Sequence, residues 1–469
     1  MTATVSSSSA RQALLARFRA KLEINSALNR SLVSYQSNRK RPFYRWFKYK
    51  EGFSAALVEY VLDHYRLHKG VLLDPFAGCG AALLVGREYG LGGQGIELLP
   101  VGVAVLSARL AAEGVSRTAF SATVEAFRSG QWQGDVDERH CFQHLTITRD
   151  AFPDQTEREL NQFRSYLAAA RLDPDIRLLL EAACLSVLES VSFTRKDGQY
   201  LRWDKRSGRD LSGKPFHKGP IPDFQEAMLR QLEIMRHDLM AGDLFAEGNG
   251  NGASSLNIER GSCLRVLPGF PARSCQIVIT SPPYCNRYDY TRTYALELAY
   301  LGTTEAQLKK LRQELLSCTV ENKSKLEELR CQYYDIGRVA EFEKAFDAFE
   351  RQEALQEVLS ILDQKGRNRE LNNANVPRMV RNYFLESAVV IFELARIVAP
   401  GGRVVMVNDN VQYAGEEVPV DLILSALAEE AGFHTEQIWV LQRGKGNSSQ
   451  QMGAHGRNEL RKCAYVWRM

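Results

Sequence analysis

The sequence predicts an α/β protein built on a doubly wound, mostly parallel sheet that is interrupted by two largely helical insertions. Between residues 71 and 112, apolar strand patterns alternate with helical patterns, which is typical of parallel strands joined by right-handed crossovers. The alternation stops after residue 112, and strand patterns resume only beyond residue 255. With 45% hydrophobic and 25% charged residues, the 469-residue chain has the composition of an ordinary globular protein.

The N-terminal part precedes the predicted sheet. Residues 11–30 carry apolar side chains near helical spacing and are expected to form a helix. Residues 30–50 hold seven Lys or Arg and no acid, interleaved with aromatic residues. This composition indicates a surface that faces a polyanion, with a solvated face as the alternative. Residues 1–50 are therefore expected to form a helical and basic arm, and Ser54 to cap the helix that follows.

The predicted strands divide the chain into a core and two insertions. Strands are expected at the start of 71–80 and at 92–98, 275–280, 401–408, 437–443 and 463–469. The core domain would comprise 51–112, 256–303 and 378–469. The first helical insertion would be 113–255 and the second 304–377.

The first insertion contains a second basic stretch, at 195–218, with eight Lys or Arg against three Asp. Such a stretch in a chain of net charge +4 favours contact with nucleic acid, with a partner-binding or solvated loop as the alternative. We therefore expect target recognition in this insertion. The residues expected to contact nucleic acid here are Arg195, Lys196, Arg202, Trp203, Lys205 and Arg206.

A glycine turn follows the first predicted strand, within Asp74-Pro75-Phe76-Ala77-Gly78-Cys79-Gly80. Glycines there let the backbone approach a ligand closely, and ligands of doubly wound sheets bind at the carboxyl ends of strands. Glu97 ends the next strand, where its carboxylate can accept hydrogen bonds from ribose hydroxyls. The spacing matches neither a dinucleotide fingerprint nor a P-loop, so the pattern favours a different nucleoside-type cofactor.

A second motif, Ser281-Pro282-Pro283-Tyr284, follows the apolar strand at 275–280. The prolines fix the backbone, so Ser281 and the Pro282 carbonyl can accept both hydrogens of an exocyclic base amine. Tyr284 offers a flat face for a base taken out of its helix. A rigid turn closing the strand is the structural alternative.

Together these motifs resemble the amino-group DNA methyltransferases, which methylate cytosine N4 or adenine N6. The resemblance implies that Phe76, Gly78, Gly80 and Glu97 bind S-adenosyl-L-methionine (AdoMet), with Asp74 beside them. It also implies that the four residues from Ser281 to Tyr284 are catalytic. The segment Lys50-Glu51-Gly52-Phe53-Ser54 is similar to the family segment that closes over the AdoMet methionine, which adds Phe53 and Ser54 to the cofactor site.

The target base follows from the first position of the catalytic motif. Serine there is typical of cytosine-N4 enzymes, so cytosine N4 is favoured and adenine N6 is the alternative.

The sequence departs from the family in two ways. Gly261-Ser262-Cys263 stands where an acid usually lies near the cofactor adenine, which leaves Ser262 as the candidate contact. The cofactor motif also precedes the catalytic motif, although many serine-type enzymes have the reverse order.

The expected reaction is direct methyl transfer to double-stranded DNA, without a metal or a covalent intermediate. Methylation at cytosine C5 is disfavoured because the chain has no Pro-Cys pair, and the nine cysteines contain no C-x-x-C pair for zinc. Arg287 and Arg292, just past the motif, are expected to hold phosphates. A regulatory subunit without turnover is the alternative of another class.

The sequence also indicates where the protein is located and which partners it has. No run of 18 apolar residues and no secretory signal is present, so a cytoplasmic protein without a membrane segment is expected. The resemblance implies a role in restriction-modification or a related defence system. A cognate restriction or defence protein would then be a second partner beside DNA.

Overall fold

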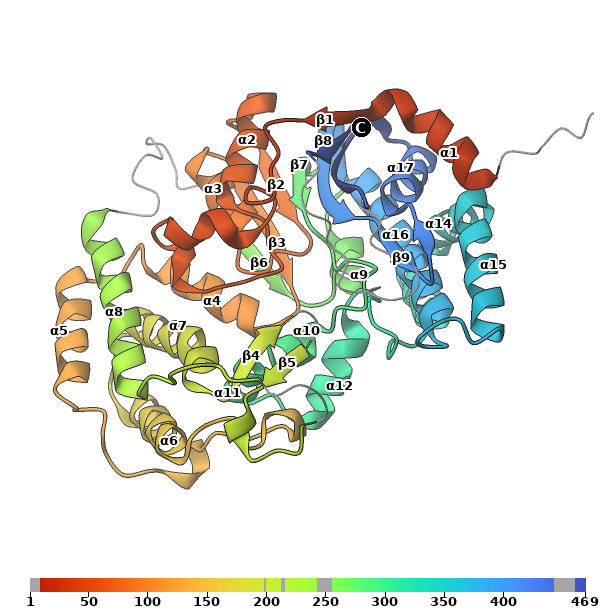
Figure 1. The fold of residues 1–469 in the computed structure, drawn as a ribbon. Helices are drawn as coiled ribbons and strands as arrows, with labels where there is room; N and C mark the ends of the chain where they lie inside the picture. The colour runs from red at the N-terminus through yellow and green to blue at the C-terminus, as the bar shows by residue number, and fades with distance from the viewer. Residues whose placement is uncertain (1–8, 198–199, 212–215, 243–254, 443–459) are drawn as a thin grey trace, which may run out of the picture.

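An eight-stranded sheet forms the centre of the molecule (Figure 1). The computed structural model describes residues 9–197, 200–211, 216–242, 255–442 and 460–469. The strands of this sheet are β1 (Leu22–Asn25), β2 (Val71–Asp74), β3 (Gly92–Glu97), β6 (Leu256–Arg260), β7 (Cys275–Thr280), β8 (Val398–Asp409), β11 (His434–Leu441) and β12 (Lys462–Arg468).

The strand order is β1-β11-β12-β8-β7-β2-β3-β6. The five strands from β8 to β6 are parallel neighbours, with Leu72 of β2 opposite Ile277 of β7 and Thr280 of β7 opposite Met406 of β8. Strand β12 runs antiparallel to both β8 and β11, and β1 pairs in parallel with β11. The sheet confirms the predicted mostly parallel α/β fold of an AdoMet-dependent methyltransferase type.

Successive residues of the central strands face two different cores, as the alternation of side chains along a strand requires. Leu72 and Ile277 belong to one core, whereas Leu73 and Val278 belong to the other. The first face is covered by α2 (Ala55–Tyr65), α3 (Ala81–Glu88) and α4 (Pro100–Ala111). The second face is covered by α9 (Cys263–Val266), α16 (Val376–Ile397) and α17 (Val420–Glu430).

The first insertion extends one of these cores, and most of the second insertion extends the other. The first insertion continues the core of α2 to α4. It contains α5 (Arg117–Arg128), α6 (Asp154–Ala169), α7 (Pro174–Val191), α8 (Phe224–Ala241) and a hairpin of β4 (Thr194–Asp197) and β5 (Tyr200–Trp203).

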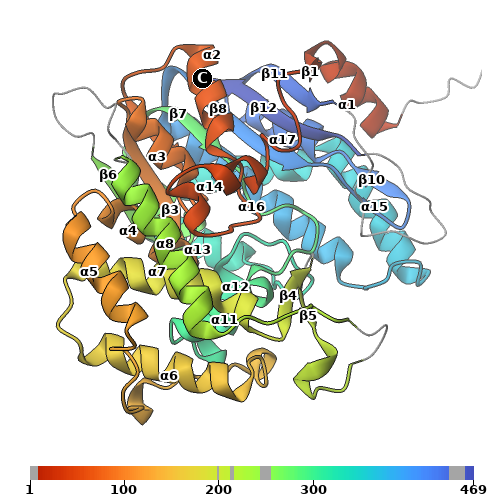
Figure 2. The same cartoon turned by 60° about the vertical axis from the view of Figure 1, so that its left-hand side comes forward.

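Most of the second insertion continues the core of α16 and α17, but Leu308 of its first helix belongs to the core of α2 to α4. It contains α12 (Glu305–Glu314), α13 (Leu326–Asp335), α14 (Val339–Arg351) and α15 (Glu353–Arg367). Two short helices, α10 (Tyr290–Thr293) and α11 (Ala295–Tyr300), lead into it, and a small hairpin of β9 (Val411–Tyr413) and β10 (Glu416–Val418) follows β8. The β4–β5 hairpin lies beside α11 and α12 in both views (Figure 1 and Figure 2).

The prediction of one helix over 11–30 is wrong in its second half. Helix α1 covers only Ala10–Phe18, and the chain then forms β1 at the edge of the sheet. Helix α1 is also fixed by side-chain contacts, since the Arg11 guanidinium lies 2.8 Å from the Glu357 carboxylate of α15. This part of the predicted arm is therefore built into the fold.

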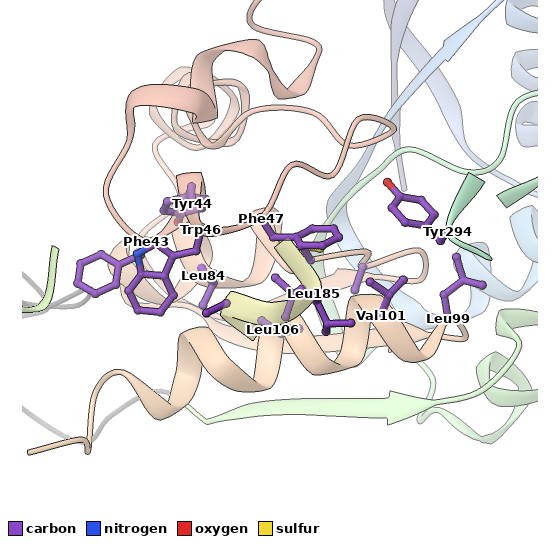
Figure 3. Close-up of a cluster of buried hydrophobic side chains, with 14 of the residues drawn as sticks. Phe43, Tyr44, Trp46, Phe47, Leu84, Leu99, Val101, Leu106, Leu185 and Tyr294 are labelled. Atoms are coloured by element: carbon purple, nitrogen blue, oxygen red, sulfur yellow. The ribbon is translucent and has the colours of Figure 1, made fainter. Parts of the chain in front are cut away.

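The interpretation of residues 30–50 as a polyanion-facing surface is corrected for the aromatic residues and for Arg41 and Arg45. Phe43, Tyr44, Trp46 and Phe47 are buried, and they pack with Leu84, Leu106 and Leu185 from α3, α4 and α7 (Figure 3). Two of the basic side chains are paired within the molecule, whereas Arg30, Arg39, Lys40 and Lys48 are exposed. Arg41 contacts the carboxylates of Glu59 and Glu88, and Arg45 forms an ion pair with the buried Asp238 of α8.

Candidate active site

A cavity lies where β2, β3, β6 and β7 end, and its empty space is about 870 Å³ when its opening to solvent is included. Parallel strands bring these four carboxyl ends to one edge of the sheet, so residues far apart in sequence meet there. The predicted site residues that line the cavity are Phe53, Phe76, Gly78, Glu97, Ser262, Ser281 and Pro283.

Glu97, at the end of β3, is the buried acid of the cavity. Its two carboxylate oxygens accept hydrogen bonds from the Gly78 and Leu99 backbone N–H groups, each at 2.6 Å. Burial raises the pKa of Glu97 to about 7, and these backbone hydrogen bonds oppose the rise. A carboxylate offers about four acceptor positions, so two remain for ligand hydroxyls.

Asp74 lies behind the cavity and does not line it. Its Oδ1 accepts hydrogen bonds from Thr280 Oγ1 at 2.7 Å and from the Phe76 N–H at 3.1 Å. Burial raises its pKa to about 7, with the Thr280 hydrogen bond opposing the rise. Asp74 thus links the end of β2 to Thr280, the residue before the second motif. The prediction that Asp74 contacts the cofactor is therefore corrected: Asp74 positions the two strand ends.

Two other predicted cofactor residues also serve the fold. Ser54 is buried as the N-cap of α2, where its Oγ accepts from the Leu57 N–H and donates to the Leu32 carbonyl at 2.6 Å. Gly80 adopts φ +79° and starts α3, and a Cβ there would lie 2.4 Å from the Leu106 side chain. Gly80 is therefore needed for the turn and for packing against α4.

The second motif forms the wall of the cavity at the end of β7. Ser281 and Pro283 line the cavity, whereas Pro282 and Tyr284 are not among its lining residues. Ser281 Oγ donates a hydrogen bond to the Tyr284 hydroxyl at 3.1 Å. Because its hydrogen is used in this way, the lone pairs of Ser281 Oγ stay available to accept hydrogen bonds from a ligand.

Sequence reasoning missed an aromatic and acidic wall of the cavity. Glu51 lines it and accepts hydrogen bonds from the hydroxyls of Tyr288 and Tyr294. The Tyr49 ring also lines the cavity and stacks on Tyr294, with ring centroids 5.2 Å apart. One signal for this wall was present in the sequence, since Glu51 lies in the segment that resembles the family segment closing over the AdoMet methionine.

Arg109 of α4 is a second residue that sequence reasoning missed. It lines the cavity, and its buried guanidinium donates to the carbonyls of Phe43, Tyr44 and Cys79 at 2.6–3.2 Å. It thereby joins the buried aromatic segment to the glycine turn. An arginine within an otherwise apolar helix pattern carries no sequence signal for such a contact.

The predicted nucleic-acid residues of the first insertion divide into two groups. Lys196 is buried, and its Nζ lies 2.5 Å from the Glu297 carboxylate of α11, so the prediction that it contacts nucleic acid is wrong. Arg206 forms an ion pair with the buried Asp204 at 2.8 Å, so its guanidinium stabilises the fold. Arg195 and Lys205 are exposed, and Arg202 is partly exposed, with its guanidinium 3.3 Å from the Asp197 carboxylate of the same hairpin.

The remaining predicted contacts are partly engaged within the protein. Trp203 is half-buried, with the Arg209 guanidinium 4.0 Å from its ring centroid. Arg287 donates to the Asn372 side chain at 2.9 Å, and Arg292 lies 3.1 Å from the Glu321 carboxylate. Residues 198–199 and 212–215 of the basic stretch lie outside the described residues.

Comparisons with known proteins identify the family. Type II methyltransferase M.AvaI from a Nostoc species and from Anabaena variabilis is 44% identical over 462 residues, covering 97% of this chain and 92% of each relative. Type II methyltransferase M.BsoBI from Geobacillus stearothermophilus is 39% identical over 467 residues, covering 95% of this chain and 89% of the relative. The chain belongs to the Type II methyltransferases. No family model and no solved structure matches it.

This Type II methyltransferase is an AdoMet-dependent, site-specific DNA methyltransferase. The cavity fits AdoMet, because Glu97 has acceptor positions for both ribose hydroxyls and the lining adds apolar surface from Phe76, Ile96 and Leu99.

In the described part of the chain, no helix is long and apolar enough to span a membrane. Among the same residues, no three His, Cys, Asp or Glu side chains form a group suited to a metal ion.

The Gly78→Ala variant of this methyltransferase is expected to lose cofactor binding. Gly78 adopts φ +54°, and a Cβ there would lie 2.9 Å from the Tyr49 ring on the cavity wall. We expect the affinity for S-adenosylhomocysteine to fall at least tenfold, or about 1.4 kcal/mol, by calorimetry. Gly302→Ala is the matched control, since Gly302 has φ +81° and open space around it. Equal affinities in the two variants would contradict this role of the turn.

Proposed function

We propose that this methyltransferase transfers the AdoMet methyl group to the exocyclic N4 amine of cytosine in double-stranded DNA. The observation that carries the proposal is Ser281 at the end of β7, with its hydrogen given to Tyr284 and its lone pairs free. An exocyclic amine has two N–H donors, and Ser281 Oγ and the Pro282 carbonyl are suited to accept them.

The protein's part in the reaction is positioning. When bound, AdoMet supplies a methyl group on a positively charged sulfur. Ser281 and the Pro282 carbonyl hold the amine so that its nitrogen lone pair faces that methyl group, and Tyr284 stacks on the flipped base. The proton released from the amine passes to water. Asp74 and Thr280 hold the two strand ends together, which fixes the distance between cofactor and amine.

Adenine N6 is the second candidate, because the cofactor motif precedes the catalytic motif in this chain. The test is to express the protein in a bacterial host that lacks DNA methylation and to sequence the genome with modification-sensitive reads. N4-methylcytosine at one short recurring site is the expected result. N6-methyladenine at such a site would refute the assigned base and keep the reaction class. A cognate restriction or defence protein is a proposed partner in the same host context.

We place DNA recognition on the β4–β5 hairpin and the turn after it. This segment presents Arg195, Arg202 and Lys205 at its surface. The buried Lys196 fixes the same hairpin to α11, which follows the catalytic motif in the chain. Bases read by this hairpin would therefore lie at a fixed distance from the amine to be methylated.

Neutralising the hairpin should weaken DNA binding for all sequences alike. In the triple variant Arg195→Gln, Arg202→Gln, Lys205→Gln, the slope of log affinity against log salt is expected to fall by about 2–3, because up to three phosphate contacts are lost. The matched control neutralises the exposed Arg128, Arg158 and Arg230 on α5, α6 and α8. An equal salt slope in the hairpin variant and the wild type, both folded, would move recognition to another surface.

A further inference from the structure

The loop after β6 lacks the means to bind the cofactor adenine in the way that the family resemblance implies. Gly261, Ser262 and Cys263 include no acid. Ser262 is the polar side chain among them, and its Oγ donates a hydrogen bond to the Glu314 carbonyl at 2.7 Å. Ser262 thus holds the end of α12 through this hydrogen bond. We therefore reinterpret Ser262, predicted to contact the cofactor directly, as a residue that supports the neighbouring segment at Glu314.

That neighbouring segment belongs to the second insertion. Glu314, Leu315 and Leu316 line the same cavity as Ser262 and Cys263. They follow the last turn of α12, where the chain leaves the helix in an extended conformation at Leu315. The second insertion therefore contributes a wall to the cofactor cavity, although it is separate from the core in sequence.

The order of strands determines which end of the cofactor this wall meets. Ser281 follows β7, Gly78 follows β2, Glu97 ends β3, and the Ser262 loop follows β6, in four neighbouring strands. The methyl group must lie near Ser281, and Glu97 is suited to the ribose hydroxyls. The nucleoside base then extends past Glu97 toward β6, where the second insertion closes the cavity.

The wall is held rigidly by a buried charge network. Lys325 Nζ donates to the Leu315 carbonyl at 2.8 Å and to the Glu386 carboxylate at 2.8 Å. The same carboxylate accepts from the Ser317 N–H at 2.7 Å, and Glu386 lies in the core helix α16. These contacts fix residues 314–317 relative to the sheet, as a ligand-binding wall requires.

We propose that the second insertion completes the adenine pocket and that the Glu314 carboxylate accepts a hydrogen bond from the adenine amino group. The Glu314 side chain is 24% exposed, and its ion-pair partner, the surface residue Lys310, is 3.7 Å away. That distance is beyond hydrogen-bond range, so the carboxylate retains acceptor capacity. Leu315 and Leu316 provide the apolar surface beside the base. This inference concerns the cofactor and goes beyond the identity of the target base.

The test compares two ligands that differ at the adenine amino group. Calorimetry is performed on the whole protein with S-adenosylhomocysteine and with S-inosylhomocysteine, in which an oxo group replaces the amine. The wild type is expected to prefer the adenosyl ligand by about tenfold or more, because the inosyl ligand offers an acceptor to a carboxylate. Glu314→Ala should bind the two ligands within about twofold. Glu314→Gln should also lose the preference, since its amide can donate to the oxo group.

Glu327→Ala serves as the matched control, because Glu327 is an exposed glutamate of the same insertion that does not line the cavity. It should keep the wild-type preference. A wild-type preference in both Glu314 variants would overturn the proposal. An equal loss of both ligands in both variants would also overturn it, because the segment would then act only as a structural wall. Binding of S-adenosylhomocysteine by the wild type is independent of the base that the enzyme methylates, so this result and the cytosine assignment can fail separately.

Discussion

Replacing Lys196 by methionine is expected to lower the free energy of unfolding by about 3–5 kcal/mol, because it leaves a buried charge without its partner. The Lys196 and Glu297 side chains are only 4% and 1% exposed. Lys196 Nζ also lies 4.3 Å from the centroid of the Tyr294 ring, so the cation loses a favourable aromatic contact as well. Urea unfolding measures the change.

The pH dependence of this variant has a defined sign. Burial raises the pKa of Glu297, and the Lys196 charge opposes the rise, so the pKa should be higher still in Lys196→Met. A carboxyl with a raised pKa in the folded state stabilises the protein at low pH and loses that contribution as pH rises. The loss of stability should therefore be smaller at about pH 5 than at about pH 8.

Two variants serve as controls for this prediction. Lys196→Met, Glu297→Leu removes both charges and should recover at least half of the lost stability. Lys205→Met changes an exposed lysine after the same hairpin and should alter stability by less than about 0.5 kcal/mol. A loss of under about 1 kcal/mol in Lys196→Met would show that the pair is not the buried anchor of the hairpin.

Ser281→Ala should lose about 100-fold to 1000-fold in turnover on DNA, by analogy with removal of one oxyanion-hole donor. The variant lacks a positioned acceptor for the target amine but keeps Glu97 and Gly78. Its affinity for S-adenosylhomocysteine should therefore stay within about twofold of the wild type. Single-turnover transfer of a radiolabelled methyl group to DNA measures the first effect, and calorimetry measures the second.

Two further substitutions separate catalysis from folding at this motif. Tyr284→Phe removes the hydroxyl that accepts the Ser281 hydrogen but keeps the ring, so it should lose less turnover than Ser281→Ala. Ser274→Ala changes the serine just before the same strand, whose Oγ donates a hydrogen bond to the Pro271 carbonyl at 2.8 Å, and it should be fully active. Wild-type turnover in Ser281→Ala would reduce the motif to a structural turn.

The sequence was sufficient to predict three of the four strands that end at the cavity, namely β2, β3 and β7. Residues 275–280 are mostly apolar, with a central Ile-Val-Ile run, and the structure begins and ends β7 at Cys275 and Thr280. Two strands of the eight-stranded sheet were not recognised, because their patterns are weak. β1 is a four-residue edge strand with two exposed residues, and β6 ends in the charged residues Glu259 and Arg260.

Local patterns also could not distinguish a basic surface from a basic segment that is buried by tertiary contacts. Residues 30–50 have the composition of a nucleic-acid-binding arm, but the acidic partners of Arg41 and Arg45, which are Glu59, Glu88 and Asp238, lie elsewhere in the chain. Lys196 has its partner Glu297 about a hundred residues away in sequence. The same limitation concealed the contribution of Glu314, because helix α12 reaches the cavity only through the packing of the second insertion.

The central claim is methyl transfer from AdoMet to an exocyclic cytosine amine at this cavity. The most direct measurement supplies the purified protein with AdoMet that carries a trideuterated methyl group and with unmethylated double-stranded DNA. The DNA is then digested to nucleosides for mass spectrometry. The account predicts the deuterated methyl group on cytosine N4, and its loss in Ser281→Ala. Label only on adenine N6 or cytosine C5, or no label in DNA, would contradict it.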